Sequence, residues 1–166
     1  MFSLNKNKNK TEIIIASDKL TKKLKRNFYE FGIKMYKGDE EENIPEEDIL
    51  YFLSDDIQEL PYILLYVLNN KVIGCVYMEH CDYVYEKFVE GGAYKISNLF
   101  VLKEYRQMNI ASKLLRRCEK IAKEDGIHTL VSDFNDLNIP SKNWHYKNGF
   151  KYMNTNIQVM KNIWDI

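Results

Sequence analysis

The sequence predicts an α/β (α+β) protein with a mixed central sheet of about six to seven strands, flanked by about four helices. Two observations predict this fold class. Short β-branched or aromatic segments alternate with segments of helical periodicity, in the order β-α-α-β-β-β-α-β-α-β-β. The 166 residues, 45% of them hydrophobic, are enough to bury the core of one domain, residues 1–166.

The N-terminal part predicts one strand and one helix. A run of three isoleucines in residues 12–16 favours the first strand. Ser17 or Asp18 is expected to cap the helix that follows, and Gly38 is expected to end it. Its apolar positions keep helical spacing and are Leu20, Leu24, Phe28, Phe31 and Met35.

A second helix and a hairpin come next. Pro45, at a first-turn position before three acidic residues, predicts a helix in a segment that Pro61 closes. Residues 62–68 and 72–78 are apolar and are separated by a short Asn-Asn-Lys turn, which predicts an antiparallel hairpin. Residues 82–92, which end in two glycines, are expected to form a loop.

The centre of the chain predicts a strand that leads into a helix. Residues 94–102 form the strand, residues 103–109 a basic and polar turn, and the helix begins at Ile110 and ends at Gly126. Such a turn presents backbone N–H groups at the positive end of the helix dipole, where phosphate binds. An ordinary strand–turn–helix unit explains this stretch alone equally well. The expected buried stripe is Ile110, Leu114, Leu115, Cys118, Ile121 and Ala122.

The C-terminal part predicts a strand over residues 129–134, a short helix over 138–148 that closes at Gly149, and a final strand pair. That pair lies around residues 151–152 and 157–163. The strands on either side of the central helix should form a right-handed parallel crossover.

Charge is balanced overall but unevenly distributed. The formal net charge is zero, which argues against nucleic acid as a partner because phosphate backbones require a basic face. Residues 39–59 hold ten acidic residues and no basic one, whereas residues 6–26 hold eight basic residues. The acidic segment could attract a cationic ligand or could form a solvated face.

The remaining composition argues against metal sites, disulfides and membrane spans. No signal-peptide pattern and no long apolar segment is present, so we expect a cytoplasmic protein without a membrane partner. The cysteines and histidines show no metal-ligand spacing and no CxxC pair. They are Cys75, Cys81, Cys118, His80, His128 and His145.

Two motifs carry a family resemblance. The family pattern Arg/Gln-x-x-Gly-x-Gly/Ala stands here as Arg106-Gln107-Met108-Asn109-Ile110-Ala111, and the downstream pattern as Asn138, Ser141, His145, Gly149 and Phe150. With the hairpin residues 72–74, residues 12–163 resemble the GCN5-related N-acetyltransferase (GNAT) superfamily and its fold. Asn109 replaces the usual glycine. If this position needs a positive φ, asparagine is the next most tolerant residue.

The resemblance implies acetyl transfer from acetyl-CoA to a primary amine. It places Leu99, Phe100 and Val101 along the pantetheine arm. The turn would hold the pyrophosphate, with Arg106 as a cation and the N–H groups of Gln107, Met108, Asn109, Ile110, Ala111 and Ser112 as donors. Asn138 and Ser141 would complete the cofactor site, although a helix-capping role also explains Asn138. No metal is implied.

The resemblance also implies catalytic roles. The N–H of Val101 would polarise the thioester carbonyl. His145 occupies the position of the family's usual tyrosine and would protonate the leaving thiolate, although a structural hydrogen bond explains it equally well and Tyr146 could serve instead. A carboxylate or an ordered water would take the proton of the amine, and the similarity to aminoglycoside acetyltransferases described next implies that Asp133 binds the acceptor and takes this proton.

A narrower resemblance concerns the acceptor. Residues 131–133 with the downstream motif, and residues 82–84, are similar to aminoglycoside 6′-N-acetyltransferases, but the glutamate expected in the fourth strand is absent at residues 96–98. A small cationic amine, aminoglycoside-like or a polyamine, is therefore the expected acceptor, used by direct attack in a ternary complex. The alternatives are a protein or peptide N-acetyltransferase and a non-catalytic acyl-CoA-binding domain. Superfamily members are often homodimers.

Overall fold

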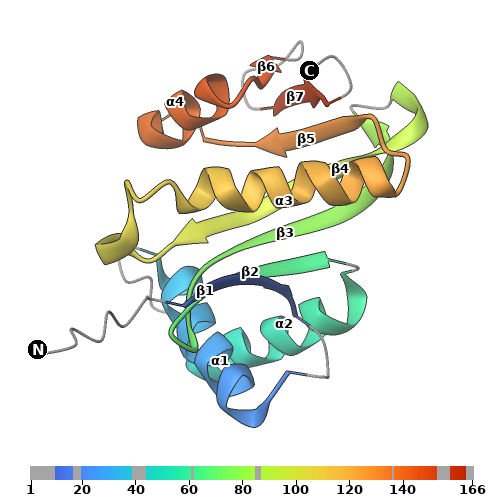
Figure 1. The fold of residues 1–166 in the computed structure, drawn as a ribbon. Helices are drawn as coiled ribbons and strands as arrows, with labels where there is room; N and C mark the ends of the chain where they lie inside the picture. The colour runs from blue at the N-terminus through green and yellow to red at the C-terminus, as the bar shows by residue number, and fades with distance from the viewer. Residues whose placement is uncertain are drawn as a thin grey trace, which may run out of the picture.

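Seven strands form one mixed sheet, which confirms the predicted mixed sheet of about six to seven strands (Figure 1). Their order in the sheet is β1-β2-β3-β4-β5-β7-β6. The computed structural model describes residues 10–16, 20–38, 44–60, 62–84, 87–135, 137–152 and 158–163. The elements follow the predicted order. They are β1 (Thr11–Ile15), α1 (Lys22–Lys37), α2 (Glu46–Glu59), β2 (Tyr62–Leu68), β3 (Lys71–Val84), β4 (Lys87–Val101), a short 3-10 turn (Lys103–Tyr105), α3 (Ile110–Glu124), β5 (Thr129–Asp133), α4 (Ile139–Lys147), β6 (Lys151–Tyr152) and β7 (Gln158–Asn162).

The only parallel pairing in the described sheet joins β4 to β5, and α3 is the element that connects them. The other paired strands run antiparallel. The predicted parallel pairing of these two strands is therefore confirmed.

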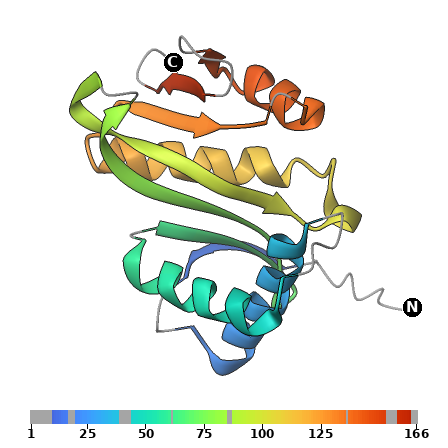
Figure 2. The same cartoon turned by 180° about the vertical axis from the view of Figure 1, so that it is seen from behind.

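Helices cover both faces of the sheet, with α3 on one face and α1 and α2 on the other, as the two opposite views show (Figures 1 and 2). On the first face, Ile110 of α3 approaches Gly74 of β3 so closely that a Cβ there would lie 3.1 Å from Ile110 Cγ2. On the second face, Phe31 of α1 packs edge-on against Phe100 of β4, with ring centroids 5.8 Å apart. The sheet is thus the middle layer of three.

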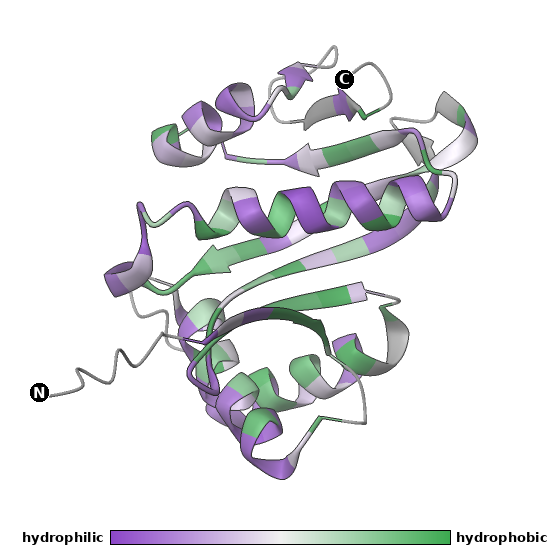
Figure 3. Ribbon diagram, in the orientation of Figure 1, coloured by the Kyte–Doolittle hydropathy of each residue, from purple (hydrophilic) through white to green (hydrophobic). Residues whose placement is uncertain are grey.

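The amphipathic stripe of α3 packs against the sheet. Hydrophilic and hydrophobic residues alternate along this helix, as the colouring by hydropathy shows (Figure 3). All six residues of the predicted buried stripe are buried, which confirms that prediction. They join a core cluster that reaches from α1 across the sheet to Phe150.

The loop predicted for residues 82–92 is wrong where the structure describes it. Tyr83 pairs with Phe88, so β3 and β4 continue as a long hairpin arm. Gly91 and Gly92 have φ of 79° and 75°, but they lie inside β4 and do not end it. A register shift between Cys81 and Tyr83 absorbs the irregularity, which is typical of a β-bulge.

The start of the first helix also differs from the prediction. Thr21 caps α1 by accepting a hydrogen bond from the N–H of Leu24 at 3.3 Å, and Leu20 precedes the helix. Residues 17–19, which include the expected caps, lie outside the described residues, as do Pro61 and Ile157. Gly38 ends α1 with a φ of 63°, as predicted. Pro45 stands as the cap of α2 and not inside its first turn.

In the described part of the chain, no helix combines the length and the apolar character needed to cross a bilayer.

Candidate functional site

The strands β4 and β5 diverge near the beginning of α3. Their paired residues run from Tyr94 and Leu130 to Ile96 and Ser132, and β4 then continues to Val101. Figure 1 shows the two strands diverging toward the end of the sheet at which α3 begins. The last residues of β4 therefore have an open edge on the side of β5.

A bulge in β4 sits where the strands diverge. Cys75 pairs with Phe100 and Tyr77 pairs with Ser97, so β4 has one more residue than β3 in this interval. Asn98 takes a φ of 46°, and its carbonyl accepts a hydrogen bond from the Cys75 thiol at 3.3 Å. Because a bulge bends its strand, it helps to turn the end of β4 away from β5. This bulge was not predicted, since residues 94–102 have a continuous strand pattern.

Backbone groups of β4 point toward the open edge. Leu102 donates its N–H to the carbonyl of Ile73 on β3 at 3.0 Å. Successive residues of a strand direct their backbone groups to opposite sides, so Val101 directs its N–H and C=O away from β3. This is the orientation that the predicted thioester contact of Val101 requires.

Two residues of the turn before α3 have left-handed backbones. Asn109 has φ 62° and ψ 21°, and Gln107 has φ 62°. The position of Asn109 therefore does need a positive φ, and asparagine tolerates it better than other non-glycine residues. Gln107 was not expected to need one.

The first turn of α3 provides free helix donors. Its first intrahelical hydrogen bond joins the N–H of Lys113 to the carbonyl of Asn109 at 3.1 Å. The N–H groups of Ile110, Ala111 and Ser112 therefore precede the ladder and have no acceptor within the helix. At the positive end of the helix dipole, they form a site suited to a phosphate oxygen.

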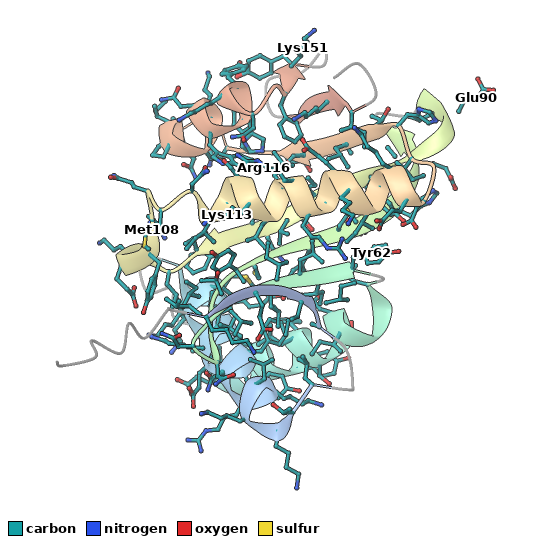
Figure 4. The ribbon with its side chains drawn as sticks, viewed as in Figure 1. Tyr62, Glu90, Met108, Lys113, Arg116 and Lys151 are labelled. Carbon is teal, nitrogen blue, oxygen red and sulfur yellow. The ribbon has the colours of Figure 1, made fainter. Side chains whose placement is uncertain are left out.

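A cationic side chain, that of Arg106, lies at this turn. Arg106 donates from Nε to the carbonyl of Val101 at 3.0 Å, and its guanidinium lies 5.5 Å from the centre of the Phe100 ring. Its positive charge is thereby held at the open edge of β4. Met108 is exposed in the turn, and Lys113 and Arg116 lie further along α3 (Figure 4).

The helix α4 is anchored beside the turn. Asn138 accepts a hydrogen bond from the N–H of Ser141 at 3.1 Å, which confirms that it caps the helix. The Trp144 indole donates to the Ser112 hydroxyl at 3.3 Å and so ties α4 to the first turn of α3. Trp144 was missed in the sequence, where its position in the motif gave no sign of this contact.

His145 lies inside the protein. It is 4% exposed among aromatic neighbours, and burial lowers its pKa from the usual 6.5. Nδ1 lies 2.8 Å from the carbonyl of Ser141, and Nε2 lies 3.0 Å from the hydroxyl of Ser132. That hydroxyl lies 3.2 Å from the carbonyl of Ile96, at the last paired residues before the strands diverge.

These contacts define the protons of His145. A carbonyl can only accept, so the neutral ring carries its proton on Nδ1, and the single hydroxyl proton of Ser132 is donated either to Nε2 of His145 or to the carbonyl of Ile96. In the charged form Nε2 donates to Ser132, whose hydroxyl then donates to the carbonyl of Ile96. Ser132, which sequence reasoning did not select, thus links His145 to the edge where β4 and β5 separate.

Two other predicted catalytic residues have different surroundings. Tyr146 is 41% exposed and packs against the ring of Tyr152, with centroids 5.4 Å apart. Asp133 lies at the exposed end of β5 and forms an ion pair with Lys95 of β4, with Nζ and Oδ2 3.2 Å apart. Lys95 was not expected to contact the site, although its place on the strand next to Asp133 could have indicated this ion pair.

No cluster of three metal-ligating side chains occurs among the described residues.

The fold agrees with the comparison with known families. The model of the acetyltransferase (GNAT) family matches residues 25–150, and the chain therefore belongs to this family of acyltransferases. No curated protein matches the chain.

Solved structures of this family resemble the fold. PaiA N-acetyltransferase from Thermoplasma acidophilum, in complex with coenzyme A, is 20% identical with a TM-score of 0.68, over 92% of this chain and 99% of that one. The aminoglycoside 6′-N-acetyltransferase AAC(6′)-IG from Acinetobacter haemolyticus is 17% identical with a TM-score of 0.68, over 87% and 94%. AAC(6′)-Iy bound to the bisubstrate analogue CoA-S-monomethyl-acetylneamine is 17% identical with a TM-score of 0.70, over 89% and 95%. At sequence identities of 17–20%, this structural similarity establishes the fold.

Proposed function

We propose that this chain, as one domain over residues 1–166, transfers the acetyl group of acetyl-CoA to a primary amine of a small cationic acceptor. The observation that carries the proposal is the left-handed turn with free helix donors beside the open edge of β4. The pyrophosphate of acetyl-CoA requires N–H donors, which the turn and the helix provide. The extended arm of acetyl-CoA requires an unpaired strand edge, which β4 provides.

The proposed cofactor site consists of three parts. The N–H groups of residues 107–112 and the guanidinium of Arg106 bind the pyrophosphate. Residues 99–101 bind the pantetheine arm along their open edge, much as a strand binds an added strand. Asn138 and Ser141, at the start of α4, border the arm. Acetyl-CoA supplies the thioester, and the side chains described here orient it.

The proposed chemistry is direct attack by the neutral amine on the thioester. The N–H of Val101 donates to the thioester oxygen as charge develops there. Asp133 binds the amine and takes its proton. In its charged form His145 gives the Nε2 proton to the Ser132 hydroxyl, which passes its own proton to the departing sulfur, with Tyr146 as the competing acid.

Acidic residues on α2 favour a cationic acceptor. The first turn of α2 holds three of them, and the helix lies on the same face of the sheet as Phe100. The similar structures include enzymes named for aminoglycoside acetylation, which is consistent with a polycationic acceptor.

The test is a thiol-release assay with acetyl-CoA and a panel of aminoglycosides, polyamines, peptides with a free N-terminus and lysine-rich peptides. We expect stoichiometric thiol and acetylated small amine, confirmed by mass spectrometry. Turnover of peptides alone would favour the protein N-acetyltransferase alternative. Absence of turnover with every amine would refute catalysis.

A second candidate, an acyl-CoA-binding domain without transfer, is favoured by one observation. The ammonium of Lys95 already pairs with Asp133, the carboxylate proposed to serve the acceptor. Binding of acetyl-CoA by calorimetry without thiol release would support this candidate.

A further inference from the structure

Three polar side chains from three elements meet on the face of the sheet that α1 and α2 cover. The Tyr36 hydroxyl of α1 donates to Oδ2 of Asp56 on α2 at 2.9 Å. The Tyr77 hydroxyl of β3 lies close enough to Asp56 to influence its ionisation. None of these residues belongs to the two sequence motifs.

Tyr77 is the unusual member of this cluster. The residue is 1% exposed, yet its hydroxyl is the one buried side-chain oxygen or nitrogen in the described part of the chain without a hydrogen-bond partner. Burial, followed by the nearby Cys75 and Asp56, raises the pKa of Tyr77, so the phenol keeps its proton. Since leaving such a group unpaired is costly, a polar atom of a ligand would stabilise it.

The packing of α1 on α2 positions the cluster. A Cβ on Gly32 of α1 would lie 2.3 Å from Cδ1 of Leu53, so glycine is required for the two helices to approach this closely. Tyr36 and Asp56 lie one turn further along their helices from this contact. Desolvation is the largest influence on Asp56 and raises its pKa, whereas the hydroxyls of Tyr36 and Tyr77 oppose that change.

The cluster lies next to the open edge of the sheet. Tyr77 pairs with Ser97 of β4, one residue before the bulge at Asn98. Lys95 and Ser97 are two residues apart in β4 and so share a face, which is the face on which Lys95 pairs with Asp133. Asp56 and Asp133 are therefore carboxylates on one face, on opposite sides of the β4–β5 opening.

An aromatic ring extends the cluster outward. Phe52 precedes Asp56 by one helical turn, is 46% exposed, and has its ring centroid 6.1 Å from that of Tyr36. A carboxylate flanked by aromatic rings and a hydroxyl oxygen is the combination that attracts an organic ammonium group.

We propose that Asp56, with Tyr36 and Tyr77, binds the second, non-reacting ammonium group of a diamine or polyamine acceptor. This inference builds on the acetyl transfer proposed above, which places the reacting amine near Asp133. The ammonium donates to the Asp56 carboxylate and to the Tyr77 oxygen, and so gives the buried hydroxyl oxygen a hydrogen-bond partner. Specificity for diamines over monoamines then originates on α2 and β3, outside both motifs.

The kinetic test compares putrescine with the aminobutanol of the same chain length, in which a hydroxyl replaces the distal ammonium. Wild-type kcat/KM should favour putrescine by about tenfold or more, which is the value of one charge-assisted hydrogen bond. Asp56→Asn should reduce this preference to about onefold. Asp55→Asn, the same change of charge at an exposed neighbouring position, should retain it. Equal losses for both amines in Asp56→Asn would overturn the proposal.

A binding experiment separates this inference from the proposed reaction. Putrescine is titrated by calorimetry into the protein saturated with coenzyme A, which cannot transfer an acetyl group. Tyr77→Phe should fold, because the removed hydroxyl has no partner to lose, and should bind putrescine several-fold more weakly than wild type. Unchanged putrescine affinity in Tyr77→Phe would overturn the inference. Putrescine binding that depends on Asp56, without thiol release, would support it and refute the acetyl transfer.

Discussion

The two sides of the β4–β5 opening are built differently. On the side of α3 and α4, side chains are joined to each other: Trp144 to Ser112, His145 to Ser132, and Arg106 to the Val101 carbonyl. On the side of α1 and α2, Tyr36 donates to Asp56, but the exposed ring of Phe52 lies beside this pair and the buried hydroxyl of Tyr77 has no hydrogen-bond partner among the described residues.

This difference corresponds to the two kinds of ligand proposed for the site. A pyrophosphate is bound by backbone donors of fixed geometry, so the residues around the turn serve to hold that geometry. An acceptor is recognised by side chains, and unsatisfied or exposed groups remain available for it. The first side should therefore respond to mutation by losing stability or cofactor affinity, and the second by changing acceptor preference.

The largest expected effect concerns the side of α3 and α4. His145→Ala removes a buried ring and two hydrogen bonds, and should lower the free energy of unfolding by about 2–4 kcal/mol in a denaturant titration. Tyr146→Ala, at the adjacent exposed position, should lower it by less than about 1 kcal/mol. Similar losses in both variants would contradict the distinction between the buried and the exposed residue.

Substitutions of Asn109 test whether the left-handed turn determines coenzyme A binding. A β-branched residue at a φ of 62° is strained, so Asn109→Val should lower coenzyme A affinity by about tenfold or more and stability by about 1–3 kcal/mol. Asn109→Gly should preserve both, since glycine adopts this conformation readily. Calorimetric titration with coenzyme A measures the difference. Equal affinities in the two variants would show that the left-handed turn does not determine binding.

The lowered pKa of His145 predicts a pH dependence of stability. Burial favours the neutral ring in the folded state, whereas the unfolded chain takes up a proton near pH 6.5. The contribution to stability is therefore complete above pH 6.5 and is lost as pH falls through the folded-state pKa, by at most about 1.4 kcal/mol per pH unit. Denaturant titrations from pH 7.5 to about pH 5 should show a smaller decline in His145→Gln. Parallel declines would exclude His145 as the source.

The smallest effect is expected at the exposed Lys95–Asp133 pair. Lys95→Met frees the Asp133 carboxylate, and should raise kcat/KM for a cationic amine by about two- to fivefold with little change in stability. Asp133→Asn should lower turnover more than it lowers acetyl-CoA affinity. If both variants reduce amine turnover equally, the ion pair has a structural role and the carboxylate does not serve the acceptor.

On the side of α3 and α4, the local features were predictable from the sequence, whereas the contacts of Trp144 with Ser112 and of His145 with Ser132 were not. The stripe of α3 follows from its periodicity, and the positive φ of Asn109 follows from the glycine that the family motif has there. The cap formed by Asn138 also depends on neighbours a few residues away.

The remaining features depend on pairing between distant segments. The bulge at Asn98 is visible only when Ser97 and Phe100 are matched to their partners on β3. Gly91 and Gly92 read as the end of a loop, yet they lie within a paired arm. The proximity of Asp56 to Tyr77 brings an acidic helix next to a buried strand, and no local pattern connects the two.

The most direct test of the central claim compares the binding of coenzyme A with that of pantetheine, which lacks the pyrophosphate and the nucleotide. The turn before α3 should make coenzyme A bind at least about a hundredfold more tightly, since several charge-assisted hydrogen bonds are lost in pantetheine. Asn109→Val should remove most of this difference by weakening coenzyme A alone. Equal affinities of the wild-type protein for the two ligands would contradict the assignment of the turn as the pyrophosphate site.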